Sequence, residues 1–124
     1  LFYDVLAVNV GSTLRPPTLQ HAQLLSLRPL GRLRKSWDDL LVELRSNSPQ
    51  RPLVVTAVGG GAAGIEAVLA SVTKLRALQP HQEIAGRLVT RSLDILPGFP
   101  RRTKRFAKLA LQRSSVTVYT NTEF

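Results

Sequence analysis

A run of glycines between two apolar segments constrains this sequence more than any other feature. Residues 52–58 (PLVVTAV) are rich in β-branched side chains and predict a buried strand. The next six residues, GGGAAG at 59–64, fit the pattern G-x-G-x-x-G. Apolar residues then recur at helical spacing as far as Leu78, shortly before Pro80. This segment therefore predicts a strand, a tight turn and a helix in direct succession.

Each glycine of this pattern has a mechanical role in such a turn. Gly59 would permit the tight turn, Gly61 would let the backbone approach a diphosphate, and Gly64 would let the helix pack closely on the sheet. The helix that starts here would direct unpaired N–H groups and a partial positive charge towards an anion. The alternative is a tight strand–helix turn that binds no ligand. The residues expected to bind a diphosphate are Gly59, Gly60, Gly61, Ala62, Ala63 and Gly64.

Strand and helix patterns alternate along the rest of the chain. The further strands that we expect are residues 2–10, 84–90 and 115–120. The further helices that we expect are residues 32–46, which are amphipathic, and residues 101–113. In the second of these helices, Phe106, Leu109 and Ala110 are expected to face inward. The order of elements predicts an α/β, Rossmann-like three-layer domain with a mostly parallel sheet, truncated in this chain.

The charge balance favours an anionic partner. Seventeen Lys and Arg residues stand against eight Asp and Glu residues, which gives a net charge of +9. The excess lies in residues 14–51 and 100–124, and we expect the basic residues of helix 101–113 to form mainly a solvated face. Aromatic residues make up only 6%, which makes nucleic acid the less favoured partner. The alternative function is a basic, non-catalytic binding module for nucleic acid or an acidic partner.

Several kinds of chemistry are excluded by composition. The chain has no cysteine, so it forms no disulfide, thiolate metal site or cysteine nucleophile. Its two histidines, His21 and His81, are too far apart in sequence to indicate a metal site. No apolar run approaches the length of a bilayer span, and no signal-peptide pattern opens the sequence. We therefore expect a cytoplasmic protein, and we assign no residue as an acid, base or nucleophile.

The end of the strand after the glycine turn bears on which dinucleotide could bind. This strand ends in LVTRS at 88–92, and no acidic residue follows before Asp94. A carboxylate there would bind the ribose 2′-OH of NAD, whereas an arginine would accommodate the 2′-phosphate of NADP. Thr90 and Arg91 therefore favour NADP over NAD, unless Arg91 is simply a solvated loop residue. FAD is a third candidate, since its diphosphate can bind to the same kind of turn.

Two motifs together resemble a known family. The sequence GGGAAGIE at 59–66, followed about thirty residues later by DILPGF at 94–99, resembles the NAD(P)H-binding domain of the FAD-dependent pyridine nucleotide-disulfide oxidoreductase superfamily. The opening YDVLAVNVGS at 3–12 is similar to the element of this family where the FAD domain continues into the NAD(P)H domain. Asn9-Val10 within it resembles the NADH dehydrogenase-like branch that is associated with selenide water dikinase.

The resemblance implies a division of the chain into three segments. Residues 1–13 would end a strand element of the FAD domain, and residues 14–51 would form a connector that contains the amphipathic helix. Residues 52–124 would be the NAD(P)H-binding Rossmann domain, incomplete at its C-terminus. The chain is therefore expected to be a fragment of a larger flavoenzyme, whose other parts would be its partners.

The resemblance also implies roles for individual residues. Gly11 and Ser12 would lie near FAD in the parent enzyme, and Glu66 would lie near the nicotinamide end of NAD(P)H. The alternative for Glu66 is an acidic residue favoured by the positive end of the helix dipole. In the whole enzyme this domain would hold the nicotinamide for hydride transfer to the flavin. For the chain alone we expect cofactor binding without turnover.

Overall fold

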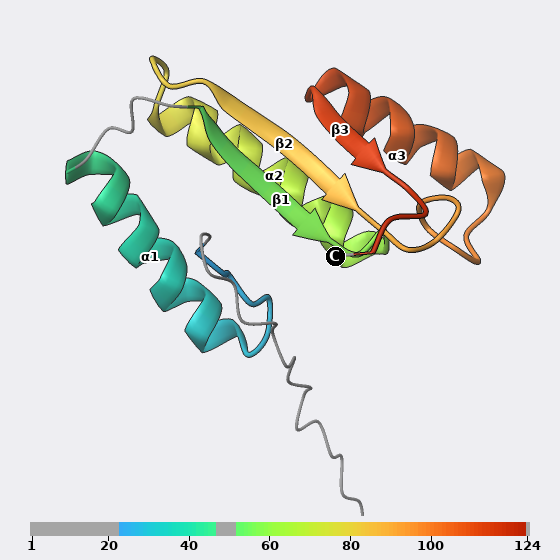
Figure 1. Ribbon diagram of the computed structural model, residues 1–124, viewed down its shortest axis with the longest axis horizontal. Helices are drawn as coiled ribbons and strands as arrows, with labels where there is room; N and C mark the ends of the chain where they lie inside the picture. The colour runs from blue at the N-terminus through green and yellow to red at the C-terminus, as the bar shows by residue number, and fades with distance from the viewer. Residues whose placement is uncertain (1–22, 47–51, 124) are drawn as a thin grey trace, which may run out of the picture. The chain divides into compact units, whose positions relative to one another are not determined.

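The computed structural model describes residues 23–46 and 52–123 (Figure 1). The chain divides into two compact units, Leu1–Ser48 and Pro49–Phe124. The strand predicted at 2–10 lies outside the described residues, as do Gly11 and Ser12. None of the helices in the described ranges combines the length and the apolar character that a bilayer span requires.

The described part of the first unit contains one helix, α1 (Leu30–Ser46). It begins two residues before the predicted helix and ends at the predicted residue. Leu44 is buried, whereas the charged side chains of the helix are exposed, and Lys35 forms an exposed ion pair with Asp39 (2.8 Å) one turn further on. The prediction of an amphipathic helix in this segment is confirmed.

The second unit is built on a parallel sheet of three strands. These strands are β1 (Leu53–Val58), β2 (Ile84–Val89) and β3 (Val116–Tyr119). They lie in the order β1-β2-β3, and their last residues, Val58, Val89 and Tyr119, are in register. Because the strands are parallel, their carboxyl ends lie at one edge of the sheet. The predicted α/β, Rossmann-like class is confirmed, and the described sheet is entirely parallel.

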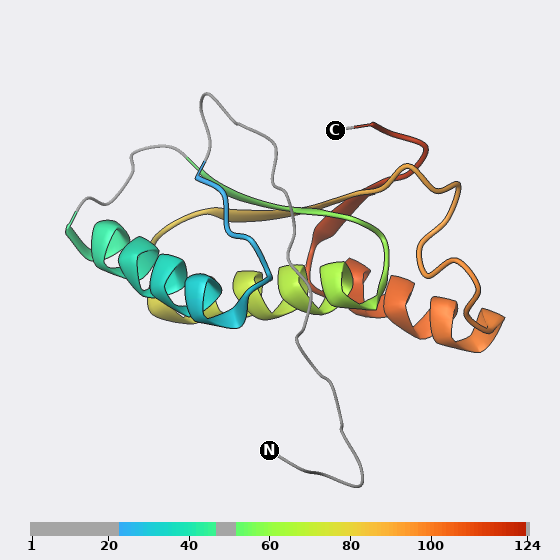
Figure 2. The same cartoon turned by 90° about the horizontal axis from the view of Figure 1, so that it is seen from below.

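Two helices connect the strands, and both cover the same face of the sheet (Figure 2). The helix α2 (Ala62–Leu78) joins β1 to β2, and α3 (Arg101–Arg113) joins β2 to β3. Within this unit, the described residues therefore supply the sheet and one helical layer of the expected three-layer arrangement. Val54, Val58 and Tyr119 are among the residues exposed on the opposite face.

The core lies between α2 and the sheet. Val72 and Leu75 of α2 are buried, as is Leu88 of β2. Gly86 in β2 is needed for this packing, because a Cβ added there would come within 2.8 Å of Val116 Cγ2 and 3.0 Å of Val72 Cγ2. A glycine that weakens the strand pattern in the sequence is thus explained by the close approach of α2 and β3.

Arg76 ties three elements of this unit together. Its guanidinium donates hydrogen bonds to the carbonyl oxygen of Ile84 at the start of β2 and to that of Ser114 after α3, both at 2.8 Å. The side chain is half-buried. One of the basic residues of the sequence is therefore used to hold the fold together and is not part of a solvated face.

The predicted inward face of α3 is wrong for Phe106 and Leu109, whereas Ala110 is half-buried as part of the inner side. Phe106 is 59% exposed and Leu109 is 37% exposed, whereas Leu111 is fully buried. Ala107, one turn before Leu111, and Ala110 are half-buried beside it. Small side chains next to Leu111 allow α3 to approach β3 and α2 closely, so the helix is rotated away from its larger apolar residues.

Candidate functional site: the glycine turn after β1

The candidate site is the turn between β1 and α2, at the carboxyl ends of the strands (Figure 1). Gly59 continues the sheet for one residue, since its N–H donates to the carbonyl oxygen of Val89 (2.8 Å). The chain then turns through Gly60 and Gly61, and α2 begins at Ala62. The strand, turn and helix thus follow one another in the predicted order.

The three glycines of the G-x-G-x-x-G pattern have three different surroundings. Gly59 has a φ of +111°, a conformation that residues with a Cβ rarely adopt. A Cβ at Gly64 would overlap the carbonyl oxygen of Gly59, so only glycine lets α2 lie this close to the end of β1. A Cβ at Gly61 would meet nothing within 4 Å. Two glycines are therefore required by the fold, and the third leaves an open position.

The open position lies at the N-terminus of α2. Gly61 is the N-cap residue, with φ −78° and ψ 177°, and no side chain forms a capping hydrogen bond to this end of the helix. The first-turn N–H groups of an α-helix have no acceptor within the helix. Gly61, Ala62 and Ala63 are all exposed to solvent. The amides of this turn can therefore donate to an anion, and no acidic side chain stands in the first helical turn to repel one.

The loop that follows β2 packs against the glycine turn. The N–H of Leu96 donates to the carbonyl oxygen of Gly60 (2.7 Å), and Leu96 itself has a φ of +51°. A Cβ at Gly60 would come within 2.9 Å of the Thr90 side chain. Gly60 is thus buried beneath Thr90 and the loop, which holds the turn in place. Leu96 is a site residue that the sequence did not indicate, because no local pattern shows a contact with a residue 36 positions earlier.

Thr90 and Arg91, predicted to contact the adenosine end of a dinucleotide, differ in their surroundings. Thr90 is buried, and its backbone N–H donates to the carbonyl oxygen of Tyr119 (2.9 Å). Its hydroxyl oxygen accepts a hydrogen bond from the N–H of Ser92 (3.3 Å). Arg91 is exposed, and no described residue pairs with its guanidinium. Thr90 therefore supports the loop, whereas Arg91 is free to bind an anion.

Glu66 lies early in α2, two residues after Gly64, and is exposed. The structure thus places Glu66 on the same helix as the open N-terminus, with its side chain in solvent. The site residues predicted near FAD, Gly11 and Ser12, lie outside the described residues.

The sheet order limits what the described residues can form around the turn. In open α/β sheets, ligands bind in the crevice where the strand order reverses. The order β1-β2-β3 contains no reversal in the described part of the chain, and β1 is an edge strand there. In such a crevice the described residues would supply a single wall, made of the glycine turn and the loop after β2.

Comparisons with known proteins do not assign the chain to a family. No family model matches it, and no curated protein matches it.

Proposed function

We propose that this chain is part of the NAD(P)H-binding Rossmann domain of an FAD-dependent pyridine nucleotide oxidoreductase. The observation that carries the proposal is the set of three glycine environments in one strand–turn–helix unit. Positive φ at Gly59, open space at Gly61 and backbone contact at Gly64 match the three roles that this motif has in dinucleotide-binding turns. A turn that served only to reverse the chain would have no need of glycine at the open position.

The proposed site binds the diphosphate through the backbone. The N–H groups of Gly61, Ala62 and Ala63 would donate to its oxygens, and the positive end of the α2 dipole would favour its charge. Arg91 would pair with a 2′-phosphate, so the proposed preference is for NADPH over NADH. Thr90 would act indirectly, because its side chain packs on Gly60.

When bound, the reduced nicotinamide supplies a hydride, for which the FAD of the parent enzyme is the proposed acceptor. The residues of this chain contribute binding and orientation, and none is proposed as an acid, base or nucleophile. Because the described strands form one wall of the crevice, we expect the chain alone to bind the cofactor and not to turn over. The proposed compartment is the cytoplasm, in keeping with a chain that contains no cysteine for disulfide formation.

The test compares Gly61→Asp with Gly31→Asp in titrations with NADPH and NADH. Both glycines lie in open space and neither has a positive φ, so the same substitution is sterically free at both positions. Asp is a preferred N-cap residue and is stabilising near a helix N-terminus. At position 61 it would therefore leave the stability unchanged or raise it, while its carboxylate repels the diphosphate.

We expect saturable NADPH binding by the unmodified chain and by Gly31→Asp, and loss of that binding in Gly61→Asp with no fall in the melting temperature. NADPH binding that survives Gly61→Asp would contradict the proposal. A short DNA duplex serves as the comparison ligand. If the duplex binds in a salt-dependent way, unaffected by Gly61→Asp, and NADPH does not bind, the alternative of a basic binding module is favoured.

A further inference from the structure

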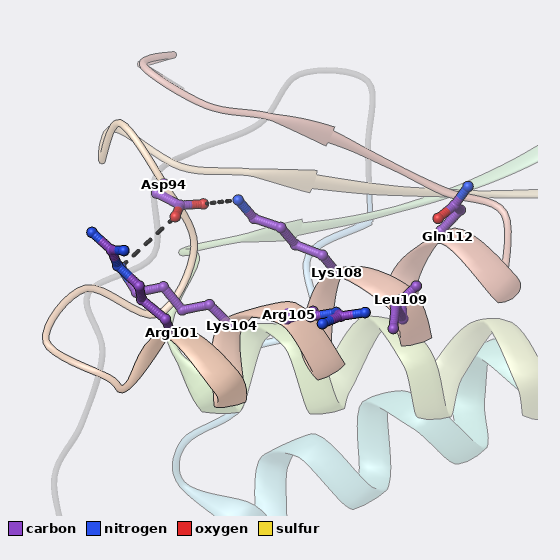
Figure 3. A pocket seen from close by; sticks show the side chains of 7 residues that line it. All are labelled: Asp94, Arg101, Lys104, Arg105, Lys108, Leu109 and Gln112. Atoms are coloured by element: carbon purple, nitrogen blue, oxygen red, sulfur yellow. Dashed lines mark ion pairs between the residues drawn. The ribbon is translucent and has the colours of Figure 1, made fainter.

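A basic groove runs along the exposed side of α3, and no residue of the glycine turn lines it (Figure 3). Its volume is about 320 Å³. We call it the α3 groove. Its charged lining consists of one carboxylate, Asp94, and four cations, which are Arg101, Lys104, Arg105 and Lys108. Leu109 and Gln112 complete it. Four cations against one carboxylate give the groove an excess of three positive charges.

Two of the four cations are already engaged by the carboxylate. Lys108 Nζ lies 2.8 Å from one oxygen of Asp94, and Lys104 Nζ lies 3.7 Å from the other. The hydrogen bond from Lys108 is the main cause that holds the pKa of Asp94 below its ordinary value. Arg101 and Arg105 have no ion-pair or hydrogen-bond partner among the described residues, and both are exposed. Two of the three excess positive charges are therefore carried by guanidinium groups one helical turn apart, and the third remains on the two lysines that share Asp94.

Apolar side chains border these guanidinium groups. Leu109 lines the groove and is 37% exposed, and Phe106 on the adjoining side of α3 is 59% exposed. The guanidinium carbon of Arg102 lies 5.7 Å from the centre of the Phe106 ring. The outer side of α3 thus combines a basic stripe with two large apolar side chains that the sheet does not cover.

We propose that the α3 groove binds an acidic amphipathic helix of a partner protein. Arg101, Arg105 and Lys108 follow one another at spacings of four and three residues, so they lie in a row along one side of α3. Carboxylates spaced by three or four residues on a facing helix recur at about 5–6 Å and would match that row. A guanidinium and a carboxylate can form two parallel hydrogen bonds, which favours Arg101 and Arg105 as the main contacts.

The apolar border favours a protein over other polyanions. A phosphate backbone would pair with the basic row but would leave Phe106 and Leu109 in water. A bilayer surface is flat on this scale, so it would contact the outer cations without filling the hollow. An amphipathic helix can cover the apolar pair with its own apolar residues and place its acids against the row, which satisfies both features at once.

The test uses the full chain and a labelled helical peptide whose one face carries Glu at spacings of three and four residues beside Leu. A second peptide has Gln in place of every Glu. The groove variant is Arg101→Gln/Arg105→Gln, and the matched control is Lys74→Gln/Arg87→Gln, which removes two exposed charges elsewhere in the same unit. All four side chains are exposed, so circular dichroism should show unchanged helix and sheet content in both variants.

We expect the Glu peptide to bind the unmodified chain, and the groove variant to weaken that binding by about tenfold, the sum of two exposed ion pairs. The control variant should change the affinity for the Glu peptide by less than about twofold. Phe106→Ala should also weaken peptide binding, while Gly61→Asp should leave it unchanged, which separates this proposal from that of the dinucleotide site. Failure of the Glu peptide to bind, equal binding of the Gln peptide, or equal losses in the groove and control variants would each overturn the proposal.

Two comparison ligands complete the test. A short DNA duplex and vesicles that contain an anionic phospholipid are titrated with the same variants. The proposal fails if the DNA duplex or the vesicles bind the unmodified chain and bind the groove variant more weakly, while the affinity of the Glu peptide is the same for both. The partner is then of another class. If only the Glu peptide responds to both Arg101→Gln/Arg105→Gln and Phe106→Ala, the groove is assigned to an acidic protein partner.

Discussion

The glycine turn after β1 and the α3 groove are both suited to anions, but they achieve this in opposite ways. At the turn, the donors are backbone amides, and the charge comes from the end of a helix. The surrounding residues are glycine and alanine, and two of the glycines are required, Gly59 by its positive φ and Gly64 by its contact with the backbone. At the groove, the donors are long side chains on a helix surface, of which only Lys104 and Lys108 are held by ion pairs to Asp94.

This difference determines how each region should respond to change. A site made of backbone is coupled to the fold, because the contacts that shape it also join α2 to β1. A site made of exposed side chains can be altered without disturbing the core, because its residues contribute little to burial. Mutations of the packed residues of the turn, such as Gly64, should therefore lower stability, whereas mutations along the groove should leave it almost unchanged.

The largest difference in stability is expected between a Leu→Ala substitution in the core next to the glycine turn and the same substitution in the α3 groove. Leu88→Ala removes a fully buried side chain that lies near Gly64, and we expect a loss of about 2–5 kcal/mol in the free energy of unfolding. Leu109→Ala, at a side chain that is 37% exposed, should cost less than about 1 kcal/mol. Urea unfolding measures both. Equal losses of unfolding free energy in the two variants would mean that the turn is no more strongly coupled to the fold than the groove is.

The next largest effect on stability is expected at Gly64, the glycine that contacts the backbone of Gly59. Gly64→Ala places a Cβ against the carbonyl oxygen of Gly59, which cannot move without displacing the end of β1, and we expect a loss of about 1–3 kcal/mol. Gly31→Ala is the matched control, because a Cβ there meets nothing within 4 Å and alanine favours the helix by up to about 1 kcal/mol. Urea unfolding should show opposite signs for the two variants. A Gly64→Ala chain as stable as the unmodified one would refute the steric argument.

A smaller effect is expected on cofactor preference. Arg91→Gln should weaken NADPH binding by about tenfold and leave NADH binding unchanged, because only NADPH carries the 2′-phosphate. Arg87→Gln, an equal loss of charge in β2, should change neither affinity. Calorimetric titrations of both cofactors measure this. If the two cofactors lose affinity equally in Arg91→Gln, the assignment of Arg91 to the 2′-phosphate is wrong.

The smallest effect should come from Asp94 in the groove. Lys108 lowers the folded-state pKa of this carboxyl, so its contribution to stability is present above the unfolded-state pKa of about 4. That contribution is lost as the pH falls through the lower folded-state pKa. Asp94→Asn should remove this part of the acid dependence and alter the urea midpoint only slightly near neutral pH. A variant with an acid profile identical to that of the unmodified chain would show that the ion pair contributes nothing measurable to stability.

Much of the fold could be predicted from local patterns. The bounds of α3 and the last residue of α2 agree with the sequence prediction, and β1 and β2 differ from it by one residue, whereas α2 begins at Ala62, within the predicted glycine turn. Periodicity and β-branched runs act within a few residues, and proline and glycine punctuate them, so a single segment carries enough information. The position of the glycine turn between β1 and α2 was predictable for the same reason.

The orientation of α3 was not predictable in this way. Phe106 and Leu109 are larger than the alanines around Leu111, and size alone favours them as core residues. The space left beside β3 and α2 decides instead which side of the helix is buried, and it accommodates Leu111 with its small neighbours. The exposed apolar border of the α3 groove follows from this choice.

The sequence by itself determined where the described strands, the glycine turn and the described helices lie, to within a few residues, because these depend on neighbouring residues and on the conformational freedom of glycine at Gly59. The tertiary structure decided what no local pattern contains. It holds Leu96 on the carbonyl of Gly60, makes Gly86 necessary between Val72 and Val116, and uses Arg76 to join Ile84 and Ser114. These contacts join residues that are distant in the chain, and only the packed unit brings them within bonding distance.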